Sequence, residues 1–114
     1  MALVHEFGII EDLSQTLDQE YTPEKYHCIS VDDAYILPLL PSFFLMKTYF
    51  HSLDQPEYGL AYYGITLISP ESLSSFLAII LAAKPLNQQE DMIELSQKIL
   101  QAQREKKYMI HYGV

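Results

Sequence analysis

The sequence predicts an α+β domain, in which a mostly antiparallel sheet of about four or five strands carries two main helices on one face. Two observations support this fold class. Short segments rich in aliphatic and aromatic residues recur between residues 3 and 68, and two later segments show helical spacing before a last apolar stretch at 108–112. We expect residues 1–114 to form a single domain, because a chain of this length builds one hydrophobic core.

Five segments are expected to form strands. Residues 3–10 mix apolar and polar positions as a short strand does, although residues 8–17 also fit the start of a helix. Residues 26–31 alternate between two faces, and residues 43–51 are rich in aromatic side chains. Residues 58–68 have apolar side chains on both faces, which predicts a central strand. The C-terminal apolar stretch completes the set.

Two helices are expected after the fourth strand. Ser69-Pro70-Glu71 combines a capping residue, a first-turn proline and an acid, and predicts a helix over about 70–83. Its apolar side chains form one stripe: Leu73, Phe76, Leu77, Ile80 and Leu81. Asn87 and Glu90 resemble a capping box, which predicts a second amphipathic helix over about 88–106.

A mostly apolar segment, residues 34–46, follows the second expected strand. Asp32 or Asp33 is expected to cap a short helix there, which Pro38 or Pro41 ends or kinks. An apolar segment of this kind also provides a contact for a homodimer. A self-associating structural module is therefore one function to consider.

The charge of the chain excludes some partners and favours others. Seven basic and fifteen acidic residues give a net charge of −8, and residues 1–57 hold ten of the acids but only two bases. Nucleic acid and anionic membranes are excluded as ligands, because both attract basic proteins. A basic protein partner is favoured, because complementary charge speeds and selects encounters.

The N-terminus lacks the basic and apolar regions of a signal peptide, and no apolar run reaches the length of a membrane span. A single cysteine, Cys28, cannot form an intramolecular disulfide. We therefore expect a cytoplasmic protein without a transmembrane segment.

The sequence contains no cofactor or metal motif. Its four glycines are too dispersed to bind a nucleotide phosphate, and one cysteine with scattered histidines does not suit zinc. His27 beside Cys28 is not expected to activate the thiol, because adjacent residues on a strand point to opposite faces. The one cluster considered as a catalytic site is His51, Asp54 and Tyr62, which could transfer protons in a small cofactor-independent hydrolase or isomerase.

The leading functional hypothesis is a small acidic module that binds another protein. An immunity or inhibitor protein that neutralises a toxin is a concrete example, by analogy of size and charge alone. Acids of the N-terminal half and tyrosines of the sheet would supply the contacts, because tyrosine suits protein interfaces. The candidate binding residues are Glu20, Glu24, Asp32, Asp33, Tyr49, Tyr58 and Tyr62.

Overall fold

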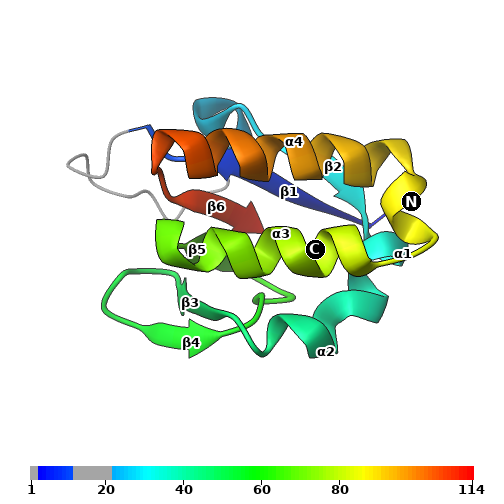
Figure 1. Ribbon diagram of the computed structural model, residues 1–114. Helices are drawn as coiled ribbons and strands as arrows, with labels where there is room; N and C mark the ends of the chain where they lie inside the picture. Colours follow the sequence, from blue (N-terminus) through cyan, green and yellow to red (C-terminus); the bar gives the residue numbers. More distant parts are fainter. Residues whose placement is uncertain (1–2, 12–21) are drawn as a thin grey trace.

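The computed structural model describes residues 3–11 and 22–114 and confirms the predicted α+β class (Figure 1). One antiparallel sheet has six strands in the order β2-β1-β6-β5-β3-β4. The strands are β1 Val4–Ile9, β2 Ile29–Asp32, β3 Lys47–Phe50, β4 Pro56–Tyr58, β5 Ile65–Ile68 and β6 Met109–Tyr112.

Two main helices, α3 (Leu73–Ala82) and α4 (Glu90–Glu105), lie side by side over one face of the sheet (Figure 1). Both match the predicted ranges to within a few residues. The remaining helical segments are short: η1 Pro23–Tyr26, α1 Asp33–Ile36, η2 Leu37–Leu39, α2 Leu40–Phe43, η3 Pro70–Ser72 and η4 Leu86–Gln88.

The main core fills the space between this sheet face and the helices. Phe76 of α3 contacts the rings of Phe7 and Phe43 at centroid distances of 5.7 and 5.6 Å. All three side chains are fully buried. A smaller apolar cluster on the other sheet face includes Leu67 and Ile110. The sheet is therefore covered on both faces at its centre.

The sheet has one strand more than the predicted four or five, because residues 56–58 form an edge strand of their own and only residues 65–68 of the strand expected over 58–68 are in the sheet's β5. Gly59 and Gly64 have φ angles of +83° and +120°, which turn the chain away from an extended path. The residues before this turn form the short edge strand β4, and those after it form β5. The predicted central position of this segment is confirmed for β5, which lies between β6 and β3.

Two other expected strands begin later than predicted. The strand expected over residues 26–31 begins at Ile29, because Tyr26 ends η1 and His27 adopts a left-handed conformation with φ +53°. The strand expected over residues 43–51 begins at Lys47. Phe43 and Met46 instead share a helical turn closed by the hydrogen bond from Met46 N to Phe43 O, which turns both side chains into the core.

The remaining local predictions concern the first strand and the helical cap. Residues 4–9 form a strand, so the strand interpretation of the N-terminal segment is confirmed there, whereas residues 12–21 lie outside the described part. Asp32 caps α1 by accepting a hydrogen bond from Ala34 N at 2.8 Å. The short helix α1 ends at Ile36, ahead of both prolines, and Pro38 and Pro41 lie at the second positions of η2 and α2, where a proline is tolerated.

Candidate functional site

A chain of polar side chains crosses the main core at one end of the sheet. The strand register places His111 of β6 directly opposite Phe7 of β1 and Thr66 of β5. His5 lies two residues before Phe7, so its ring points to the same face. Asp33 begins α1 immediately after β2 and reaches the ring of His5. Four residues distant in sequence thereby become neighbours.

Five hydrogen bonds connect this chain, which we call the His–His network. It comprises Asp33, His5, His111 and Thr66, with Tyr62 at its outer end. The bonds join Asp33 Oδ1 to His5 Nε2 at 2.8 Å, His5 Nδ1 to His111 Nε2 at 2.8 Å, His111 Nδ1 to Thr66 Oγ1 at 3.2 Å, Ala61 N to Thr66 Oγ1 at 2.8 Å, and the Tyr62 hydroxyl to Asp33 Oδ2 at 2.9 Å.

The two imidazole rings meet edge to edge. Their planes are inclined by only 16°, and their centroids are 5.1 Å apart. Stacked rings would have centroids much closer together, whereas the bonded nitrogens are only 2.8 Å apart, so the rings lie nearly in one plane. An in-plane N–H···N bond fits this geometry.

One charge state satisfies every member of the His–His network. An ionised Asp33 only accepts, so His5 Nε2 must donate to it, and His5 Nδ1 of the neutral ring is then an acceptor. His111 Nε2 donates to that acceptor, and its Nδ1 accepts from the Thr66 hydroxyl. In this arrangement the Thr66 hydroxyl, His111 and His5 each donate toward the Asp33 carboxylate, and the lowered pKa of His111 favours its neutral form.

Burial governs the chemistry of the His–His network. His5, His111 and Thr66 are fully buried, and Asp33 is nearly so. Burial, with a smaller contribution from His5, lowers the pKa of His111 well below its usual value. The hydrogen bond to Asp33 raises the pKa of Tyr62. The two rings and the Thr66 hydroxyl are buried, whereas Tyr62 at the outer end is partly exposed, and the connected hydrogen bonds order this end of the sheet.

The structure does not join the three predicted catalytic residues by hydrogen bonds. Tyr62 donates to Asp33 and packs edge-on against the ring of His5, with centroids 5.6 Å apart. His51 is exposed, has a φ of +68° and lies over Gly64. Asp54 is exposed in the turn between β3 and β4.

The candidate binding residues are dispersed. Asp32 and Asp33 are engaged inside the fold, as a cap and as the acceptor of the His–His network. Glu24 is exposed, and Glu20 lies outside the described residues. The strand register places Tyr49 and Tyr58 together on the sheet face away from α3 and α4, whereas Tyr62 lies beside the His–His network.

Cys28 belongs to the smaller apolar cluster and is half-buried. Burial, reinforced by the negative charge of Glu6, raises the pKa of its thiol to about 12. The thiol is therefore protonated and unreactive at neutral pH. His27 is exposed in its left-handed turn and does not lie on a strand, contrary to the geometry assumed from the sequence.

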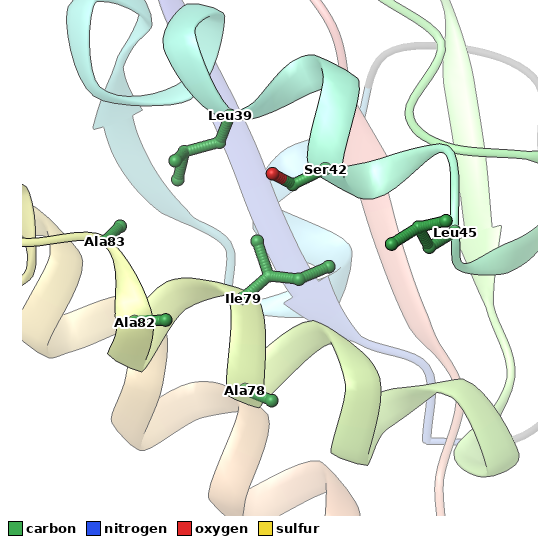
Figure 2. A pocket seen from close by; sticks show the side chains of 7 residues that line it. All are labelled: Leu39, Ser42, Leu45, Ala78, Ile79, Ala82 and Ala83. Atoms are coloured by element: carbon green, nitrogen blue, oxygen red, sulfur yellow. The ribbon is translucent and has the colours of Figure 1, made fainter.

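An apolar groove of about 330 Å³ lies between α3 and the segment that carries η2 and α2. Figure 2 shows Ile79 of α3 pointing toward this segment, with Leu45 at one end. We call the groove the α2–α3 surface. Its lining residues are Leu39, Ser42, Leu45, Ala78, Ile79, Ala82 and Ala83.

Large apolar side chains stand exposed in the segments that form the α2–α3 surface. The exposed fraction is 86% for Leu45, 63% for Phe44, 53% for Leu81 and 51% for Leu37. Neither residues 34–46 nor residues 72–83 contain a charged residue. Of these four side chains, Leu45 also lines the groove. Exposed apolar side chains that gather on one surface are typical of sites where proteins bind one another.

The neighbouring helix α4 shows what an ordinary solvent-facing helix of this protein looks like. Its exposed positions include four charged residues, Glu90, Glu94, Arg104 and Glu105, together with the apolar Ile93 and Leu100. The exposed positions of α3 are instead Ser74, Ser75, Ala78, Leu81 and Ala82.

The His–His network was not predicted from the sequence. His5 and His111 are 106 residues apart, whereas the predicted catalytic residues lie close together in the chain. A usable signal was present: each histidine shares a strand face with apolar residues, His5 with Phe7 and His111 with Met109. A histidine on a core-facing position needs a buried partner.

Within residues 3–11 and 22–114, no group of three or more His, Cys, Asp or Glu side chains is arranged to hold a metal ion. The helices of that same part of the chain are all too short or too polar to cross a membrane. Comparisons with protein-family models, with curated proteins and with solved structures found no match to this chain.

Proposed function

We propose that this protein is a protein–protein interaction module that binds through the α2–α3 surface. The observation that carries the proposal is the lack of any charge in residues 34–46 and 72–83, although both segments expose large apolar side chains. Interface cores are depleted in charged residues and enriched in apolar ones. The α2–α3 surface has this composition.

The shape of the α2–α3 surface also supports binding. Ala78, Ala82 and Ala83 line the α3 side of the groove with small side chains, while Leu45 stands at its rim. Small side chains beside a protruding one allow the close packing that a partner helix or segment requires.

The acidic N-terminal half supports a second contact, with a basic partner. Exposed Glu24 would contribute there, but Asp32 and Asp33 already accept hydrogen bonds within the fold. An immunity or inhibitor protein would use this acidic half against a basic toxin. We propose a cytoplasmic location, which the single cysteine supports.

The test uses the purified, immobilised protein as bait. The bait is incubated with a cell extract and, separately, with the same purified protein in solution. Ala78→Glu places a charge in the groove, and Gln97→Glu places the same charge on the exposed side of α4. We expect a bound protein to be retained by the wild type and by Gln97→Glu, and to be lost from Ala78→Glu, because a buried unpaired charge is costly.

Equal retention by Ala78→Glu and the wild type would contradict the proposal. A third bait, Glu24→Gln, distinguishes the two surfaces. Loss of binding with Glu24→Gln but not with Ala78→Glu would assign the contact to the acidic half.

A further inference from the structure

We propose that the α2–α3 surface binds the same surface of a second copy of this chain, with the two α3 helices antiparallel. This inference rests on the proposed function and names its partner. The observation that points to a second copy is the charge pattern around α3, which is complementary to itself.

Opposite charges flank the uncharged segment that contains α3. Exposed Glu71 lies just before the helix, and exposed Lys84 lies just after it. In a two-fold dimer with antiparallel helices, Glu71 of each copy lies opposite Lys84 of the other. The helix dipoles are then antiparallel as well. A parallel arrangement would instead place like charges together.

The outer face of α3 suits this arrangement. The alignment that pairs residue 71 with residue 84 also pairs Leu81 with Ser74 of the other copy. The largest exposed side chain of the helix then lies against one of the smallest. Ala78 lies near the two-fold axis, where a small side chain allows the helices to approach closely.

The acids that give the chain its net charge of −8 lie outside residues 72–83, so they do not meet at the centre of this contact. Residues 72–83 are uncharged, so pairing them buries no ionised side chain. A contact of one helix and its adjoining groove is small, and we expect a dissociation constant of the order of 10–100 μM.

The test is a charge-reversal cycle read by sedimentation equilibrium. Each single reversal, Glu71→Lys or Lys84→Glu, replaces two attractive contacts of the dimer by repulsive ones. We expect each to weaken dimerisation about tenfold, and the double variant to return to within about threefold of the wild type. Glu94→Lys on α4 is the matched control and should leave the dissociation constant within about threefold.

The double variant also separates dimer contacts from effects on the helix itself. Glu71 and Lys84 both complement the dipole of α3, so the double reversal is unfavourable for each isolated helix. Recovery of the dimer despite this effect would support the antiparallel contact. A double variant weaker than both single variants would overturn it.

A wild-type chain that stays monomeric up to about 1 mM would also overturn the inference. The proposed function has a separate outcome. If the monomer still captures another protein and loses it on Ala78→Glu, the α2–α3 surface binds a different partner. If Ala78→Glu changes nothing, the proposed function fails as well.

Discussion

His111→Ala should reduce the free energy of unfolding by about 3–5 kcal/mol, because it removes a fully buried ring and takes one hydrogen bond from each of two buried polar partners. The lost ring also contacts Phe7, with centroids 4.8 Å apart. His5 Nδ1 loses its donor, and the Thr66 hydroxyl loses the acceptor of its proton while still accepting from Ala61 N. Urea unfolding followed by circular dichroism measures the loss.

Two variants make this result specific. His111→Gln keeps an N–H group at the end of the side chain that can donate to His5, so it should lose less stability than His111→Ala. His27 is exposed and has a left-handed backbone conformation, which asparagine also adopts readily. The control His27→Asn should therefore stay within about 0.5 kcal/mol of the wild type. A His111→Ala protein within about 1 kcal/mol of the wild type would show that the His–His network contributes little.

Stability should fall as the pH is lowered below about 6.5, the ordinary pKa of histidine. Burial lowers the pKa of His111 in the folded protein, so the unfolded chain binds a proton that the native state does not. Stability is therefore fully present above the unfolded pKa and is lost as the pH falls below it. The expected slope is about 1.4 kcal/mol per pH unit for this one proton.

The pH dependence is measured by urea unfolding between pH 7 and pH 5, above the range where carboxylates titrate. The groups that face His111 are His5, Thr66 and Phe7, and a proton added at His111 Nδ1 would force the hydrogen bond with the Thr66 hydroxyl to reverse. His111→Gln removes the titrating ring and should flatten the slope. Equal slopes for the wild type and His111→Gln would contradict this account of the buried ring.

Local chemistry made much of the fold predictable. Ser69, Pro70 and Glu71 mark the start of the first long helix because each residue suits a helix N-terminus, and the structure has its η3 and α3 segments there. Periodicity alone could not separate strand from helix in residues 43–46, which are short and apolar. Packing against the core determines the conformation of this segment, because a helical turn buries both Phe43 and Met46.

The site was predictable only in part. The apolar segment 34–46 was expected as a possible dimer contact, and it forms one wall of the α2–α3 surface. The predicted apolar stripe of the first long helix left Ala78 and Ala82 outside the core face, but the sequence did not show which segment lies beside them; Leu81, predicted in the stripe, is exposed. The His–His network depends on the register of β1, β6 and β5, which pairs residues far apart in the chain.

The most direct test of the interface is oxidative cross-linking through Ala78→Cys. A residue near the two-fold axis lies beside its own copy, and a disulfide requires Cα atoms about 4.4–6.8 Å apart. Cys28 can remain in place, because burial raises the pKa of its thiol to about 12. We predict a covalent dimer for Ala78→Cys and a monomer for the control Gln97→Cys on α4. Equal cross-linking of the two variants, or none in either, would contradict the antiparallel α3 contact.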